Sequence, residues 1–162
     1  MNTIEELQQT FAYDPNTGII KWNRKTTRKT KKGKIAGSRS NGYINIQFNK
    51  TCYYAHRLAF LLHTGQWPSK QIDHINGVKD DNRWMNLRLA TMRENHMNIK
   101  KQSNNTSGHK NVHFCKTRNK WIAKVKISKT KHKQSCFESL EAAVQKAKEL
   151  RTTYYKEFAR HE

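Results

Sequence analysis

The residues best suited to chemistry lie close together near the middle of the chain. Asp73 and His74 are adjacent. Asn86 follows His74 by twelve residues, and Asn95 follows nine residues further on. A carboxylate can hold a hard divalent cation, a neutral imidazole can take a proton from water, and an amide oxygen on a following element can complete the metal site. Metal-dependent hydrolysis of a phosphodiester bond needs this combination.

A longer signature surrounds this spacing. Residues 53–60 follow the pattern Y-x-A-H-R-L-A-F, residues 64–68 follow T-G-x-W-P, and residues 72–77 read I-D-H-I-N-G. Together these segments resemble the HNH endonucleases that are common in phage genomes and in intron-encoded homing elements. The resemblance implies a ββα-metal module, in which two short strands and a helix fold around one metal ion. The implied catalytic core spans about residues 53–99.

The resemblance also implies a role for each motif position. Asp73 and Asn95 would be the protein ligands of one divalent ion, and His74 would be the general base. Asn86 would pin the loop between the two strands through side-chain to backbone hydrogen bonds, and we count it with the catalytic residues. Because an amide oxygen is a hard donor, Asn95 favours Mg²⁺ or Mn²⁺. Arg57 is either a packing residue or, as the family pattern implies, a phosphate contact.

Three neighbouring residues could be mistaken for parts of the metal site. Asp80 and Asp81 belong to D-D-N, which is typical of turns, so we expect them to shape the turn. On a helix, His96 points about 100° away from its neighbour Asn95. This favours a surface position or a phosphate contact for His96.

The charge distribution indicates a polyanionic partner. The formal net charge is +20. No Asp or Glu occurs in residues 15–72 or 95–137, whereas these stretches hold twelve and eleven Lys or Arg. Basic flanks suit the phosphate backbone and a rare acidic centre suits a cation, so we expect double-stranded DNA as the partner.

The remaining composition predicts a cytoplasmic protein. Cys52, Cys115 and Cys136 lack C-x-x-C spacing and are expected to be reduced thiols. No apolar run approaches the roughly 18 residues of a membrane span, and no apolar signal segment is expected, so we predict no membrane partner. If the gene belongs to a phage, the location is the cytoplasm of the bacterial host.

The N-terminal region predicts short helices and strands. Thr3 can cap a helix over 3–11, with Glu6 as in a capping box. Strands are predicted over 19–22 and 43–48, and a second helix over 54–64 that ends at Gly65. Between the strands, residues 25–37 form a basic loop whose candidate DNA contacts are Lys29, Lys31 and Lys32.

The C-terminal region reads as a separate unit. Residues 100–109 are polar and aperiodic, which predicts a linker. Strands are predicted over 111–116, 121–127 and 133–137, followed by a helix that Ser139 caps. With T-S-G-x-K-x-V before the first strand and W-x-A-x-V in the second, the unit resembles the AP2 DNA-binding domain, which lays a three-stranded sheet in the DNA major groove.

The predicted DNA contacts of this unit follow from strand alternation. Alternation places Lys124 and Lys126 on one sheet face and Trp121 on the face that backs onto the helix, which favours a core position for Trp121 over a contact with bases. Lysines mostly contact phosphates, which position a protein without specifying sequence. The candidate contacts are Arg118, Lys120, Trp121, Lys124 and Lys126.

These observations predict an α+β protein. A nuclease region over 1–99 would be followed by the linker at 100–109 and by a small three-stranded antiparallel sheet plus helix, AP2-like, over 110–162. The predicted function is metal-dependent DNA cleavage, as a nick by a monomer or a double-strand cut by a homodimer. A non-catalytic DNA-binding regulator and a structure-specific or RNA-directed nuclease remain alternatives.

Overall fold

The structure is a computed structural model that describes residues 2–28, 30–128 and 130–161. The chain divides into two compact units, residues 1–92 and residues 93–162. The division falls at the start of α3 (Met92–Met97), whereas the sequence suggests a boundary at 100–109. Within the described ranges, no helix is long and apolar enough to cross a membrane.

The first unit begins with a capped helix and a small hairpin. The hydroxyl of Thr3 accepts a hydrogen bond from the backbone N–H of Glu6, as predicted, at the start of α1 (Ile4–Thr10). The predicted helix end at residue 11 is wrong, because Phe11 is extended and starts β1 (Phe11–Tyr13). β1 pairs antiparallel with β2 (Ile20–Trp22). The ring of Phe11 lies 4.7 Å from that of Trp22, and this tertiary contact explains why the helix ends early.

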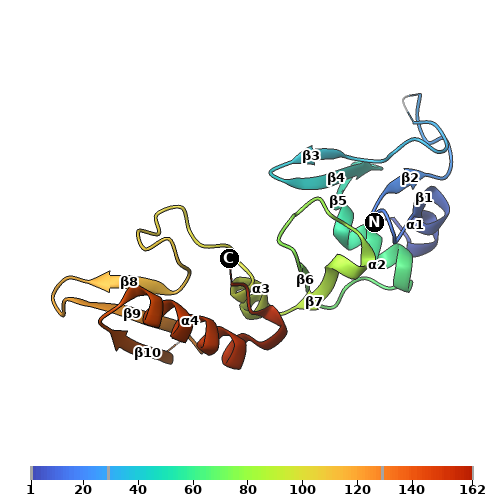
Figure 1. Cartoon of the computed structure of the whole chain (residues 1–162). Coiled ribbons are helices and arrows are strands. Elements are labelled where there is room, and N and C mark those ends of the chain that lie inside the picture. The colour runs from blue at the N-terminus through green and yellow to red at the C-terminus, as the bar shows by residue number, and fades with distance from the viewer. Residues whose placement is uncertain (1, 29, 129, 162) are drawn as a thin grey trace. The chain divides into compact units, whose positions relative to one another are not determined.

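A three-stranded antiparallel sheet and a helix complete the upper part of this unit (Figure 1). The sheet has the order β3 (Ser38–Ser40), β4 (Tyr43–Phe48) and β5 (Thr51–Tyr54). β5 leads directly into α2 (Ala55–Thr64), which ends at Gly65 in the left-handed conformation, as predicted. One apolar core joins α1, β2, β4 and α2 through Leu7, Trp22, Ile46, Leu58 and Leu61.

The motif strands are anchored in the same core. β6 (Gln71–His74) pairs antiparallel with β7 (Leu87–Ala90), and a short 3₁₀ turn, η1 (Trp84–Asn86), precedes β7. Ile72 of β6 and Leu87 of β7 belong to the apolar cluster. Each lies next in sequence to a motif residue, Asp73 or Asn86. Core packing therefore fixes the backbone at both ends of the loop that the motif spans.

The β1–β2 turn braces this loop from the other side. The hydroxyl of Tyr13 donates to the carbonyl of Asn82 at 2.8 Å, and the N–H of Trp84 donates to the carbonyl of Pro15 at 2.9 Å. Gly18, at φ +74°, lies so close to residues 82 and 83 that a Cβ would come within 2.5 Å of their backbone. Only glycine tolerates both the φ and the approach. The N-terminal hairpin thus holds the motif loop in place.

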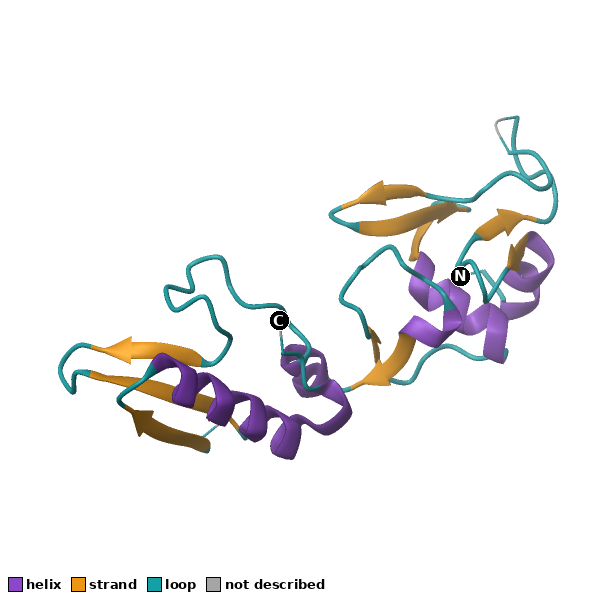
Figure 2. Ribbon diagram, viewed as in Figure 1, coloured by secondary structure: helices purple, strands orange, loops and turns teal. Residues whose placement is uncertain are grey.

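The second unit contains a three-stranded sheet with one long helix packed against it (Figure 2). β8 (Val112–Cys115), β9 (Lys120–Lys126) and β10 (His132–Phe137) are antiparallel in the order β10-β9-β8. Ser139 caps α4 (Leu140–Tyr155), as predicted, and η2 (Lys156–Phe158) follows. Val112 and Ala123 pack against Ala143 and Ala147 of α4. The three predicted strands and the helix are confirmed to within a residue or two at each end.

Candidate active site

Asp73 and His74 are both buried at the end of β6. Asp73 is 4% exposed and His74 is 6% exposed. Residue 73 lies opposite Arg88 in the register of β6 and β7, and Arg88 places its Nε and Nη2 each 2.8 Å from Oδ2 of Asp73. This is a buried ion pair with charge-assisted hydrogen bonds. Arg88 was not among the predicted site residues, because only the strand register reveals the pairing.

Asn82 holds the imidazole of His74. Nε2 of His74 lies 3.3 Å from Oδ1 of Asn82, and Asn82 itself is only 3% exposed. Burial lowers the pKa of His74, although the hydrogen bond with Asn82 and the nearby Asp73 act in the opposite direction. A lowered pKa keeps the ring neutral at cell pH, which a general base requires.

Two further rings lie close to this imidazole. The ring of His56 meets that of His74 edge to face at 5.1 Å, and Tyr43 lies 6.2 Å away. Burial lowers the pKa of His56 to about 3, with smaller effects from His74 and Arg57. His56 is therefore neutral and packs as an aromatic ring.

Asn86 ties the motif loop together with three hydrogen bonds. Its Oδ1 accepts from the N–H of Asn76 at 2.9 Å, and its Nδ2 donates to the carbonyl of Asp81 at 2.7 Å. Its own carbonyl accepts from the N–H of Ile75 at 2.9 Å. The two bonds of the Asn86 side chain are the side-chain to backbone hydrogen bonds that the family resemblance implies. They fix the loop that begins at His74.

We expect Asn86→Ala to damage the site indirectly. The change leaves two partly buried backbone groups, the N–H of Asn76 and the carbonyl of Asp81, without their side-chain partner, and the cost of up to about 1–3 kcal/mol for each is reduced where water can replace that partner. The free energy of unfolding should therefore fall, and cleavage should fall with the displacement of His74, while DNA affinity stays within about threefold. Asn76→Ala is a matched control, because it removes an exposed side-chain amide from the same loop and leaves the Asn86 side chain in place. Equal activity of Asn86→Ala and wild type would contradict the positioning role.

Both acidic residues of the loop have partners within the first unit. Asp81 accepts hydrogen bonds from Nη2 of Arg83 at 2.6 Å and from Nδ2 of Asn76 at 2.7 Å. The hydrogen bonds with Arg83 lower the pKa of Asp81 to about 2. Asp80 pairs with Arg39 at 3.3 Å. The contacts of Asp81 agree with the turn-shaping role predicted for it, whereas the ion pair of Asp80 reaches Arg39 on β3, outside the turn.

The donor set suits a hard divalent cation. The Asp73 carboxylate is a buried oxygen donor. It already forms an ion pair with one cationic group, the guanidinium of Arg88. Asn95, the predicted second ligand, lies on α3 and is counted with the second unit, so its ligand role stays a prediction from the motif. Within the part of the chain that the structure describes, no three His, Cys, Asp or Glu side chains gather as a metal site.

The predicted DNA contacts lie on exposed segments of each unit. Arg57 is half-buried on α2, and Lys31 and Lys32 are exposed in the loop before β3. Lys29 lies outside the described residues. Lys124 and Lys126 are exposed on β9, and Arg118 is exposed in the turn before it.

Two of the predicted contacts have partners within the second unit. Lys120 forms an ion pair with Glu138 at 3.0 Å. Trp121 packs against the helix-facing core and lies edge to face with Phe114 at 5.0 Å. The packing of Trp121 is the core position that strand alternation favours, and a DNA contact by Trp121 stays a prediction.

Comparison with known proteins gives a match over the motif segment. Residues 53–97 match the family model described as HNH endonuclease. No curated protein and no solved structure matches the chain. The matched residues run from the end of β5 to the end of α3 and contain Asp73, His74, Asn86 and Asn95. This segment is an HNH endonuclease module, and the protein that carries it is a nuclease that hydrolyses phosphodiester bonds.

Proposed function

We propose that this protein is a DNA endonuclease of the phage or homing type that uses Mg²⁺ or Mn²⁺ and has His74 as its general base. The observation that carries the proposal is the environment of His74. Its imidazole is buried beside Asp73, is held by Asn82, and lies at the start of a loop that Asn86 closes, all within the HNH-matched segment.

The hydrogen bond with Asn82 assigns the two ring nitrogens of His74 different tasks. When the Nε2–H group donates to the amide oxygen of Asn82, Nδ1 keeps its lone pair and can accept a proton from water. The neutral ring that burial favours is the form that can do so. Asn82 is therefore proposed as the residue that sets the tautomer and orientation of the base.

The metal site of the proposal combines Asp73 with Asn95 of the motif. A divalent cation held there would stabilise the negative charge on the leaving 3′ oxygen. Because the Asp73 carboxylate is paired with Arg88, we expect a cation to bind weakly until DNA phosphate oxygens add to the site. The expected products carry 5′-phosphate and 3′-hydroxyl ends, as the family resemblance implies. A monomer has one active site and would nick, whereas a double-strand cut would need a homodimer or two successive events.

A ligation experiment tests the predicted reaction. Supercoiled plasmid is incubated with the protein and Mg²⁺, the open circles are purified, and DNA ligase is added. We expect ligase to reseal the nicks, because it requires adjacent 5′-phosphate and 3′-hydroxyl ends. Open circles that are resealed only after kinase and phosphatase treatment would contradict the proposed direction of hydrolysis.

A competition experiment separates DNA from RNA as substrate. Labelled plasmid cleavage is measured at fixed salt with increasing unlabelled duplex DNA or structured RNA, since phosphate contacts alone do not distinguish the two polymers. Stronger competition by DNA supports the proposal. Stronger competition by RNA, with RNA cleaved in the same mixture, would favour an RNA-directed nuclease.

A further inference from the structure

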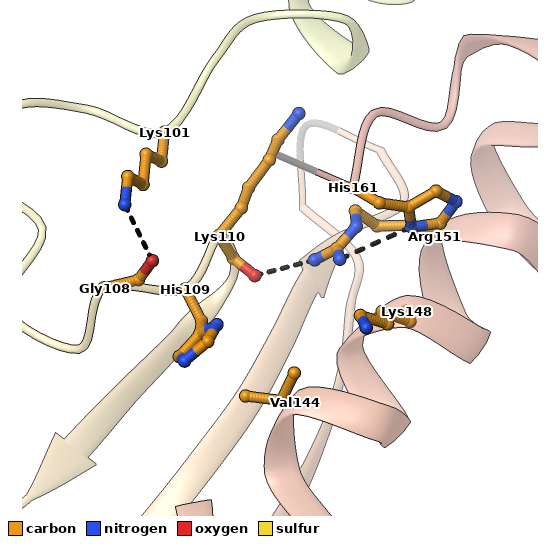
Figure 3. A pocket seen from close by; sticks show the side chains of 8 residues that line it. All are labelled: Lys101, Gly108, His109, Lys110, Val144, Lys148, Arg151 and His161. Carbon is orange, nitrogen blue, oxygen red and sulfur yellow. Dashed lines mark hydrogen bonds between the residues drawn. The ribbon is translucent and has the colours of Figure 1, made fainter. Parts of the chain in front are cut away.

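A basic pocket lies in the second unit, on the helix side of the sheet. It has a volume of about 270 Å³ and is formed by the segment that precedes β8, by α4 and by the C-terminal tail. Figure 3 shows the cationic and imidazole side chains around it. They are Lys101, His109, Lys110, Lys148, Arg151 and His161. Among the residues that the structure describes, the lining contains no carboxylate.

Arg151 is a buried cation with neutral partners. Its side chain belongs to a residue that is 2% exposed. Nη1 donates to the carbonyl of Lys110 at 2.6 Å and lies 3.5 Å from Oδ1 of Asn111, while Nη2 lies 3.5 Å from Nδ1 of His161. Nε is buried and has no hydrogen-bond partner among the described residues. Across those same residues, no carboxylate lies within ion-pair distance of the guanidinium.

Burying a charge without a counterion is costly, and the neighbours of Arg151 add to the cost. Burial, Arg151 and Arg160 together lower the pKa of Lys110 to about 8. Burial lowers the pKa of His161, and Arg151, Lys148 and Lys110 lower it further. The charged forms of Lys110 and His161 are therefore repelled by the positive charges around them. An anion in the pocket would reverse this repulsion and provide an acceptor for the unpaired Nε–H.

We propose that this pocket is a binding site for a phosphate group. A water molecule takes up about 30 Å³ in the liquid, so the pocket accommodates a tetrahedral oxyanion with some hydration. It is smaller than most small-molecule pockets, which span roughly 300–1,000 Å³. The phosphate can come from the DNA backbone or from free phosphate. The site is separate from the exposed β9 lysines, and the proposal rests neither on catalysis nor on the sheet contacting DNA.

The first arm of the test uses inorganic phosphate and the full chain in EDTA. The variants are Lys148→Gln, which changes an exposed side chain, and the double variant Lys110→Gln/Lys148→Gln. Lys146→Gln is the matched control, because it removes the same charge from α4 and does not line the pocket. We measure the melting temperature by circular dichroism in phosphate and in chloride of equal ionic strength.

We expect phosphate to increase the melting temperature of the wild type and of Lys146→Gln by more than it increases that of the double variant. At about fivefold excess over Kd, a domain of this size should gain roughly 4–8 °C. Phosphate also stabilises many proteins through exclusion from their surface, so the decisive quantity is the difference between wild type and double variant. Lys148→Gln alone should lose part of that difference even if the double variant folds poorly.

The second arm uses duplex DNA and the salt dependence of its affinity. Each lost phosphate contact lowers the slope of log K against log[salt] by about 0.9. If the double variant shows a smaller increase in melting temperature with phosphate than the wild type, and a DNA-binding slope reduced by about one, the DNA backbone is the source of the phosphate. If the double variant shows the smaller increase but keeps the wild-type slope, the source is free phosphate. If phosphate stabilises the wild type and the double variant equally, the pocket is not a phosphate site, whatever the DNA slope.

Discussion

Replacing His74 with alanine is expected to reduce the rate of DNA cleavage by about 10²–10⁴-fold, the usual contribution of a positioned general base. The measurement is single-turnover cleavage of a labelled duplex with saturating protein and Mg²⁺. DNA affinity in EDTA should stay within about threefold, because the imidazole is buried and held by Asn82. His96→Ala is the matched control, since His96 is exposed on α3 and should change the rate by less than about threefold.

The dependence of the wild-type cleavage rate on pH should also reveal His74 as the base. A base works in its neutral form, so the rate falls at pH values below its pKa. Because burial lowers the pKa of His74, the acid limb is expected below the ordinary histidine value of about 6.5. His74→Ala should lack this limb. A wild-type rate that stays flat from pH 8 down to the pH at which the protein unfolds, with chemistry limiting, would contradict the role of His74.

The second large effect is expected from Arg88→Leu. This change leaves the Asp73 carboxylate buried without its guanidinium partner, and breaking a buried ion pair in this way costs about 3–5 kcal/mol. The free energy of unfolding is measured with urea in EDTA at neutral pH. Arg83→Leu is the matched control, because the Arg83 side chain is 48% exposed and its pair with Asp81 is expected to contribute within about 1 kcal/mol.

Two further measurements separate this ion pair from simple loss of packing. The double variant Asp73→Asn/Arg88→Leu has no buried carboxylate at this position, so it should recover most of the stability that Arg88→Leu loses. Arg88 and a divalent cation compete for the same carboxylate, so Mg²⁺ should stabilise Arg88→Leu more than wild type. If the double variant is as unstable as Arg88→Leu, the loss comes from packing and not from the Asp73 charge.

Much of the local structure could be predicted because its causes are local. Thr3 and Ser139 are caps whose side chains satisfy the first N–H groups of α1 and α4, and Gly65 supplies the left-handed residue that ends α2. Strand β9 alternates between buried and exposed residues from Ala123 to Lys126. By contrast, the change from helix to strand at Phe11 depends on aromatic neighbours that are distant in sequence, Trp22 and Phe48.

In the candidate site too, some residues could be predicted from local sequence and others could not. The motif names Asp73, His74, Asn86 and Asn95, and the hydrogen bonds of Asn86 agree with the loop-pinning role. The partners that tune the site are set by tertiary structure. Arg88 reaches Asp73 through strand register.

The surroundings of Asn82 and His74 also depend on distant segments. Asn82 is held against His74 by a loop that Gly18 and Tyr13 brace, and Tyr43 reaches His74 from another sheet. No spacing rule within the motif contains these contacts. A turn-rich D-D-N sequence predicts a turn at Asn82, but not that the turn presents an amide to the base.

The most direct test of the account compares wild type and His74→Ala on supercoiled DNA, with Mg²⁺, Mn²⁺ or EDTA, and with a gel shift on the same samples. The account predicts open-circular or linear DNA from the wild type only when metal is present, loss of this product in His74→Ala, and equal DNA binding by both proteins. Binding without cleavage by the wild type on every substrate, or undiminished cleavage by His74→Ala, would contradict it.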